Sequence, residues 1–123
     1  MAAIVGCDID NALVQLNAPE TPIMDGSAKF FLEAIEAVGT QEQNAERVYF
    51  EIKEKTVWKD EKHNIEIVAY PDDHFSLNVM IDYNSKVLGN QYANMETIEV
   101  FKEEIAPCRT FVFFHELEFL FKN

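Results

Sequence analysis

The chain has 123 residues, of which 48% are hydrophobic and ten are phenylalanine, enough to build the core of one ordinary domain or parts of two. Its formal net charge of −12 argues against nucleic acid and anionic membrane surfaces as partners, because both would repel it. The sequence holds neither an apolar run of about 18 residues nor a basic-then-apolar leader, so we expect a cytoplasmic protein without a membrane-spanning segment.

The N-terminal part of the chain contains apolar segments joined by a stiff loop. Residues 1–6 are apolar, compatible with a helix, and stop at a glycine. The apolar run 12–16 predicts a short strand that is buried on both faces. In the loop 17–27, Pro19 and Pro22 each fix φ and favour an extended conformation in the residue before them, so the loop cannot be helical around them.

An amphipathic helix is predicted over residues 27–38. Gly26 permits a turn that a β-carbon would resist, and the Ser27 hydroxyl can accept a hydrogen bond from a free amide of the first turn. The apolar positions recur at i, i+3, i+4 and i+7 and form one stripe: Phe31, Ala34, Ile35 and Val38. Gly39 is a natural helix end, and the polar, aperiodic residues 41–46 indicate a boundary between domains.

From Arg47 onward, apolar side chains alternate with polar ones, which is the pattern of half-buried strands. A charged hairpin loop and a turn containing Pro71 interrupt the alternation. The strands predicted in this way are 47–52 with its continuation at 57–58, 65–70, 75–84 and a short one at 91–93. We expect an antiparallel meander with one buried face.

Helices are expected at the C-terminal end of the chain. Thr97 caps a helix that has Glu99 in its first turn and ends before Pro107. Residues 109–113 are extended or loop, and a last helix is predicted over 114–122. The fold class is therefore α+β, with an antiparallel meander sheet packed on helices.

Two motifs in the chain are long and specific. The first joins Gly6-Cys7-Asp8-Ile9-Asp10-Asn11 to the N-A-P-E-T-P-I-M-D-G-S of residues 17–27, and the second is Arg109-Thr110-Phe111. Together they resemble the signature of the zinc-dependent UDP-3-O-acyl-N-acetylglucosamine deacetylases, which carry out the committed step of lipid A synthesis. The resemblance runs over essentially the whole chain, which matches only the middle of such an enzyme.

The resemblance implies parts of two α/β sandwich-like domains. Residues 1–40 would be the C-terminal part of the first domain, 41–46 a linker, and 47–123 the N-terminal part of the second. The parent reaction it implies removes the N-acetyl group from UDP-3-O-(3-hydroxyacyl)-N-acetylglucosamine, and we expect the isolated chain to be inactive. The alternative is a non-catalytic nucleotide-sugar binding or oligomerisation module. Because each half-domain leaves an apolar face uncovered, we also expect self-association.

Thr110 is the candidate catalytic residue. A threonine hydroxyl can donate a hydrogen bond to a developing oxyanion, and in the resembling family the threonine of R-T-F stabilises the tetrahedral intermediate of amide hydrolysis. The alternative is a threonine that bonds its own backbone at a helix end. The chain has Val112 where the family usually has glycine.

The candidate substrate-binding residues lie on both sides of this motif. At a strand end, Tyr83 is flanked by Asp82 and Asn84, and the resemblance implies that its ring packs on the uridine; alternatively, Tyr83 closes the core. Phe111, Phe113 and Leu117 complete the predicted set. The last two fall where the family begins to line a passage for the acyl chain, although an ordinary helix core explains them equally well.

No zinc site is expected from this chain's own side chains. His63 and His74 fall in different turns and His115 on the last helix, whereas a catalytic zinc needs three converging ligands. In the family, the zinc ligands and a general base come from E-H-x-x-A-L and H-K-x-x-D motifs, which this sequence lacks. Asp8 and Asp10 resemble a divalent-cation pair, but such a pattern before a strand is common and we expect them to cap a turn. The two cysteines are expected to be reduced thiols.

Overall fold

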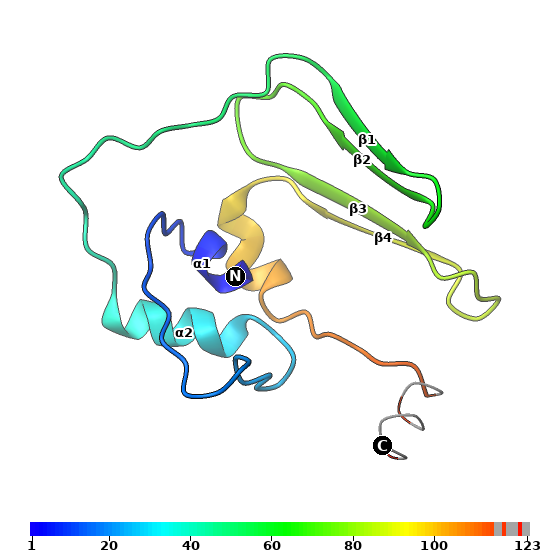
Figure 1. The fold of residues 1–123 in the computed structure, drawn as a ribbon, viewed down its shortest axis with the longest axis horizontal. Helices are drawn as coiled ribbons and strands as arrows, with labels where there is room; N and C mark the ends of the chain where they lie inside the picture. Colours follow the sequence, from blue (N-terminus) through cyan, green and yellow to red (C-terminus); the bar gives the residue numbers. More distant parts are fainter. Residues whose placement is uncertain (115–116, 118–120, 122–123) are drawn as a thin grey trace.

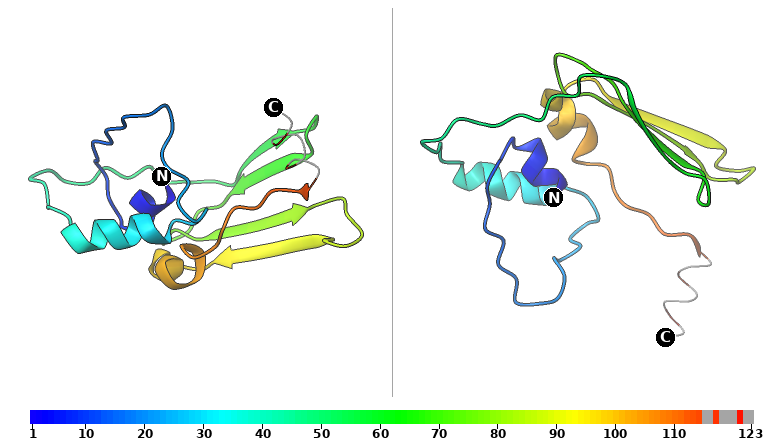
Figure 2. Two further views of the ribbon diagram at one scale, coloured as in Figure 1. Left: turned by 90° about the horizontal axis from the view of Figure 1, so that it is seen from below. Right: turned by 45° about the horizontal axis from the view of Figure 1, so that its top comes forward.

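The computed structural model describes residues 1–114, 117 and 121, and its fold is α+β (Figure 1). Helices and β-hairpins occupy separate regions, and the two hairpins run in the same general direction away from the helices (Figure 2). The elements are α1 (Ala2–Gly6), α2 (Lys29–Val38), β1 (Thr56–Asp60), β2 (Ile65–Ala69), β3 (Leu77–Asp82), β4 (Asn90–Met95), the 3-10 helix η1 (Ile98–Val100) and the π-helix η2 (Phe101–Ile105).

The four strands form two separate antiparallel hairpins, β1 with β2 and β3 with β4. Trp58 lies opposite Ile67 in the first, and Val79 lies opposite Ala93 in the second. The predicted single meander with one buried face is therefore wrong, because β2 and β3 do not pair and most strand residues are exposed. Strand β2 ends at Ala69, just before Pro71, whose missing N–H cannot extend a ladder.

Two further predicted strands are absent from the structure. Residues 12–16 and 47–52 have no regular secondary structure and are mostly exposed, with Leu13 at 86% and Val48 at 94%. An extended segment becomes a strand only when a neighbour pairs with its backbone. Within the described residues, no strand lies beside either segment to do so.

The core is small and lies where α1, α2, the end of β4 and η2 meet (Figure 1). Its buried side chains are Ala3, Leu32, Met95, Phe101 and Ala106. On α2, Leu32 is buried and Phe31 and Ile35 are half-buried against the core. The predicted stripe is only half correct, because Ala34 and Val38 are exposed. The side of α2 that packs on the core is therefore rotated relative to the side that the apolar pattern predicted.

The predicted C-terminal end of α2 is confirmed, whereas the helix begins at Lys29, two residues later than predicted. The Ser27 hydroxyl accepts a hydrogen bond from the Lys29 amide at 3.2 Å. At the other end, Gly39 has φ +77° and its amide donates to Ile35 at 2.8 Å. Gly26 also has a positive φ, +83°, as its turn requires.

The helix predicted after Thr97 is present in a different form. It is a 3-10 turn followed by a π turn, in which the Ala106 amide donates to the Phe101 carbonyl at 2.7 Å. The Ala106 carbonyl has no partner within the helix and accepts a hydrogen bond from the Ala28 amide at 3.0 Å. This bond attaches the end of η2 to the start of α2.

The last predicted helix, 114–122, is only partly within the described residues. Phe114, Leu117 and Phe121 are helical, and the Leu117 amide donates to the Phe113 carbonyl at 3.1 Å. The rest of that prediction, including His115, lies outside the described residues.

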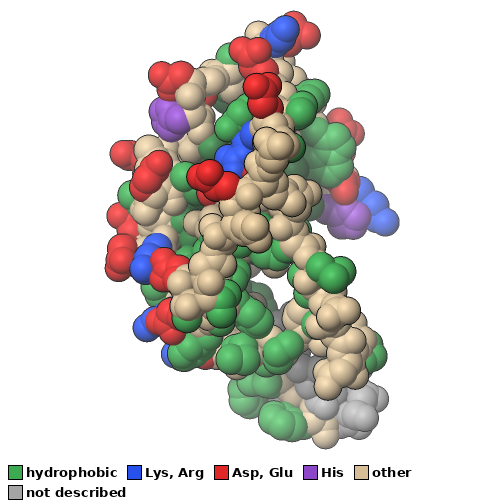
Figure 3. Space-filling model, turned by 90° about the vertical axis from the view of Figure 1, so that its left-hand side faces the viewer, with side chains coloured by type: hydrophobic (Ala, Val, Ile, Leu, Met, Phe, Trp, Pro, Cys, Tyr) green, Lys and Arg blue, Asp and Glu red, His purple; other side chains and the backbone are tan. Residues whose placement is uncertain are grey.

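The charged side chains of the chain are mostly acidic. On the face shown in Figure 3, carboxylates outnumber basic groups, in keeping with the net charge of −12. Cys7 and Cys108 are free thiols, as predicted. None of the helices in the described part of the chain has the length and apolar content needed to cross a bilayer.

Candidate functional site

The two sequence motifs meet at Gly26 and Thr110. The Thr110 amide donates a hydrogen bond to the Gly26 carbonyl at 2.8 Å. A β-carbon placed on Gly26 would lie 3.2 Å from the Thr110 Cγ2 and 3.6 Å from its amide nitrogen. Because Gly26 also has a positive φ, this position suits glycine in both conformation and space.

Asp25 adds side-chain contacts to this junction. Its Oδ1 accepts hydrogen bonds from the Ser27 hydroxyl at 2.7 Å and from the Ser27 amide at 3.1 Å. Its Oδ2 lies 3.4 Å from the Nε of Arg109, the residue before Thr110. The hydrogen bond from the Ser27 hydroxyl, supported by the Ser27 amide and the Arg109 charge, lowers the pKa of Asp25. The carboxylate is thereby kept ionised between the two motifs.

Thr110 is exposed, so its hydroxyl is accessible to a ligand. Its backbone is nevertheless held by the bond to Gly26. A hydroxyl on an anchored backbone is a suitable donor to an oxygen that gains negative charge, since little reorganisation is needed. Thr110 is the predicted catalytic residue, and these contacts describe its setting without testing that role.

Three of the predicted substrate-binding residues form an aromatic cluster. Tyr83, at the end of β3, meets Phe111 edge-to-face with ring centroids 5.6 Å apart, and meets Phe113 at 6.2 Å. Phe111 and Phe113 are 5.5 Å apart with perpendicular rings. Such pairs contribute about 0.5–1.5 kcal/mol beyond area burial. The cluster brings the β3 end beside the R-T-F motif, and Leu117 follows one helical turn after Phe113.

Asp82 and Asn84 shape the turn that begins at Tyr83. The Asp82 Oδ1 accepts the Asn84 amide at 2.8 Å, and Asn84 has φ +47°. The Tyr83 amide donates to the Gly89 carbonyl at 3.2 Å. Both polar side chains are exposed on either side of the half-buried Tyr83. One oxygen of Asp82 thus supports the loop.

The structure uses Arg47 in a way that the sequence analysis missed. Its guanidinium donates to both oxygens of Asp8, at 2.9 and 3.0 Å, and to Asp10 Oδ2, at 2.7 and 3.0 Å. Asp8 and Asp10 therefore pair with an arginine, and the predicted turn-capping role is wrong. These groups line an open hollow of about 1300 Å³ between residues 8–12 and 38–48. The sequence did contain a signal for this cluster: an arginine, rare in this acidic chain, together with two aspartates separated by a single residue.

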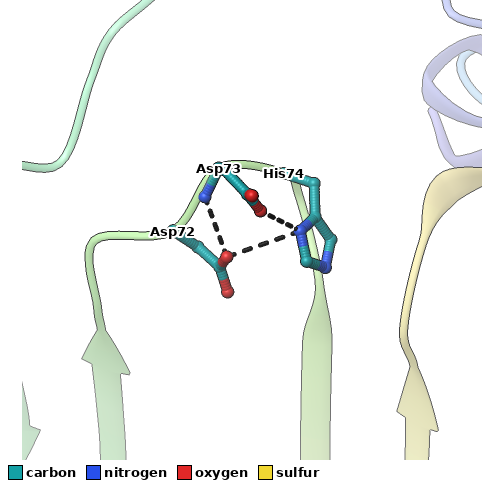
Figure 4. Close-up of side chains that lie close together, drawn as sticks. All are labelled: Asp72, Asp73 and His74. Atoms are coloured by element: carbon teal, nitrogen blue, oxygen red, sulfur yellow. Dashed lines mark hydrogen bonds and ion pairs between the residues drawn. The ribbon is translucent and has the colours of Figure 1, made fainter.

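One cluster among the described residues brings three possible metal ligands within 4.8 Å, namely Asp72, Asp73 and His74 in the turn between β2 and β3 (Figure 4). Both carboxylates point at the His74 Nδ1, with Asp72 at 3.4 Å. The hydrogen bond to Asp73 and the charge of Asp72 raise the pKa of His74. His63 instead binds Asp60 at 2.7 Å.

These described residues do not fit a catalytic zinc. Such a site needs three ligands held from a rigid frame around one open position. All three members of the cluster are exposed and come from a single turn, and both carboxylates face the His74 Nδ1 and not a shared open position. His115, the third histidine of the sequence, lies outside the described residues.

Comparison with known proteins completes this description. The sequence model of the UDP-3-O-acyl N-acetylglycosamine deacetylases matches residues 1–123. The chain belongs to this deacetylase family. The resemblance carried by the two motifs is thus confirmed.

Several members of the deacetylase family are similar to the chain. It is 47% identical over 118 residues to a bifunctional enzyme LpxC/FabZ of Bacteroides thetaiotaomicron, covering 96% of this chain and 26% of that relative. A Porphyromonas gingivalis protein of the same name is 43% identical over 120 residues, covering 98% and 26%. A UDP-3-O-acyl-N-acetylglucosamine deacetylase of Teredinibacter turnerae is 41% identical over 124 residues, covering 98% and 40%. The chain therefore spans between 26% and 40% of the length of these relatives.

Proposed function

We propose that residues 1–123 belong to a cytoplasmic, zinc-dependent amide hydrolase of lipid A biosynthesis. Its substrate is UDP-3-O-(3-hydroxyacyl)-N-acetylglucosamine, from which water releases acetate as the C–N bond breaks and the amine takes up a proton. The observation that carries this proposal is the contact between Gly26 and Thr110, because it joins the two motifs of the family. The relatives' names give the reaction class.

In this proposal Thr110 acts on the acetyl carbonyl. Its hydroxyl donates a hydrogen bond to the oxygen that becomes negatively charged when water adds to the carbonyl carbon. Losing one such preorganised donor costs about 10²–10³ in kcat. The anchored backbone and exposed side chain of Thr110 suit this role.

Tyr83 and the phenylalanines hold the two ends of the substrate. Tyr83 stacks on the uridine, with Asp82 and Asn84 as polar neighbours, and a base on an aromatic ring gains about 1–3 kcal/mol. Phe111, Phe113 and Leu117 meet the acyl chain. The aromatic cluster supports this arrangement, since it links Tyr83 to the residues after Thr110.

Zinc, when bound in the parent enzyme, would supply activated water. Because the described residues do not fit that metal, we assign no step here to it. We also propose the division of the chain into 1–40 and 47–123, joined by the linker 41–46.

The catalytic assignment is tested in the full-length gene product that contains residues 1–123. Thr110→Val, which removes the hydroxyl but keeps the volume, should lower kcat about 10²–10³-fold, while Thr110→Ser should keep most of the activity. Acetate release measured at saturating substrate checks this. Equal kcat for the wild type and Thr110→Val would remove Thr110 from the reaction.

The isolated chain is expected to be inactive. It is mixed with zinc and substrate and compared with its Thr110→Ala variant, and the two should release acetate at the same background rate. A higher rate from the wild type than from the variant would refute this expectation.

A second candidate function is a non-catalytic module that binds nucleotide sugars or self-associates. Exposed apolar side chains on the strands favour it, such as Trp58 at 53% and Met80 at 73%. Calorimetry with UDP on the wild type and Tyr83→Ala tests the binding role, and equal heats would exclude stacking on Tyr83. Light scattering at micromolar concentrations should show dimers or larger species, and a monomer throughout would exclude self-association.

A further inference from the structure

Asp25 lies at the centre of the contact between the two motifs. Arg109, its partner at 3.4 Å, directly precedes Thr110, and Gly26, whose carbonyl holds the Thr110 amide at 2.8 Å, directly follows Asp25. Asp25 and Gly26 of the first motif thus contact Arg109 and Thr110 of the second.

One of these two contacts alone leaves Thr110 free to turn. A single backbone hydrogen bond fixes the distance between two segments but permits rotation about the bond. A second contact one residue away removes that rotation and so orients the side chain between them. The hydroxyl direction of Thr110 then depends on Asp25 as well as on Gly26.

Asp25 is itself the fixed member of the ion pair. Its side chain is only 21% exposed and accepts two hydrogen bonds from Ser27, at the start of α2. The Arg109 side chain is 68% exposed. A group whose orientation is already set by its neighbours can position a more mobile partner at little further entropy cost.

We propose that Asp25 is a positioning residue for the reaction: through Arg109 and the adjoining Gly26 it orients the Thr110 hydroxyl toward the substrate. The proposal rests on the function proposed above for Thr110. Asp25 touches no reacting atom in it, so its loss is expected to affect the rate of the chemical step and leave substrate affinity unchanged.

The test is a double-mutant cycle in the full-length gene product that contains residues 1–123. Asp25→Asn keeps the size and can still accept from Ser27, but it loses the charge that meets Arg109. A shift of the hydroxyl by a fraction of an ångström should lower kcat by about tenfold with KM unchanged, because a displacement of about 1 Å costs about 10²-fold. In the Thr110→Val background the same substitution should have no further effect, since no hydroxyl remains to be oriented.

Matched variants separate positioning from folding. Glu36→Gln removes the charge of another exposed pair, Lys102–Glu36 at 2.9 Å, which joins α2 to η2 and does not include Asp25 or Arg109, and should leave kcat unchanged. Asp25→Glu, which restores the charge, should recover part of the lost rate. All variants are compared with the wild type by thermal melting, and Asp25→Asn should lower kcat while its melting temperature stays close to that of Glu36→Gln.

The outcomes distinguish this inference from the function on which it rests. If Thr110→Val leaves kcat unchanged, the proposed function fails. If Thr110→Val lowers kcat but the effect of Asp25→Asn is the same in both backgrounds, Asp25 acts independently of Thr110 and only the positioning role is overturned. A change in KM alone would also overturn it.

Discussion

The methyl carbon of Thr110 lies 3.2 Å from the position that a β-carbon on Gly26 would occupy. This separation is tighter than an ordinary van der Waals contact, and it joins two segments that are far apart in the sequence. Residue size at position 26 is therefore coupled to the position of Thr110.

We predict that Gly26→Ala is more harmful than a matched glycine substitution. Alanine at φ +83° costs about 1–2 kcal/mol in backbone strain, and its methyl group also presses on Thr110. Gly89→Ala is the control, because Gly89 has φ +58° and no atom within 4 Å of an added β-carbon. Urea denaturation should show a loss in both variants and a larger one for Gly26→Ala. Equal losses would show that the contact with Thr110 has no energetic weight.

Gly6→Ala should destabilise the core. A β-carbon on Gly6 would lie 2.1 Å from Cδ1 of Phe101, whose ring is only 6% exposed and has little room to move. Overpacking of this kind costs about 1–3 kcal/mol. Thermal unfolding measures the loss, and the double variant Gly6→Ala with Phe101→Leu should be less impaired than the sum of the two single changes. Strict additivity would contradict the steric explanation.

The junction of the motifs should weaken in acid. Since the pKa of Asp25 is lowered in the folded chain, its contribution to stability is present above its ordinary value, about 3.9, and is lost as the pH falls through the folded pKa. Amide hydrogen exchange at Thr110, corrected for the intrinsic pH dependence, should quicken in that range. The change should disappear in Asp25→Asn, and its persistence there would assign it to another group.

The turn between β2 and β3 should respond to pH in the opposite direction. The pKa of His74 is raised in the folded chain. The contribution of protonated His74 to the stability of the turn is therefore complete below its ordinary pKa of about 6.5 and is lost as the pH rises through the folded pKa. Chemical shifts of the Asp73 amide should report this loss. His74→Gln should abolish the transition, whereas His63→Gln should leave it in place.

Arg47→Lys should loosen residues 39–48. An ammonium cannot reproduce the fork that reaches both Asp8 and Asp10, although it keeps the charge. Because the cluster is exposed to solvent, which screens the charges, the loss in global stability should be small. Hydrogen exchange should be faster in 39–48 and unchanged in β1 and β2. Unchanged exchange in both regions would show that the pairing does not hold the segment.

Local features of the fold were predictable, and long-range ones were not. Gly39 ends α2 through its backbone freedom, and the Ser27 hydroxyl accepts from the first helical amide, Lys29, so the pattern located this helix to within two residues. Residues 12–16 and 47–52 have equally good strand patterns, yet a strand also needs a partner, which a local pattern does not reveal.

The candidate site shows the same division. The motifs singled out Thr110 and Tyr83, but their spacing could not show that Thr110 bonds Gly26 or that Tyr83 contacts Phe111. The Arg47 cluster was missed for the same reason, since ion pairs between distant segments leave no periodic signal.

The nuclear Overhauser effect between the Thr110 methyl protons and the Gly26 α-protons tests most directly whether the two motifs meet. It is recorded on the chain of residues 1–123, with a selectively labelled Thr110 methyl group. A strong cross-peak in the wild type, weakened in Asp25→Asn, is the predicted result. No cross-peak to Gly26, together with a Thr110 methyl shift at its unfolded value, would contradict the contact on which the proposed function and the role of Asp25 depend.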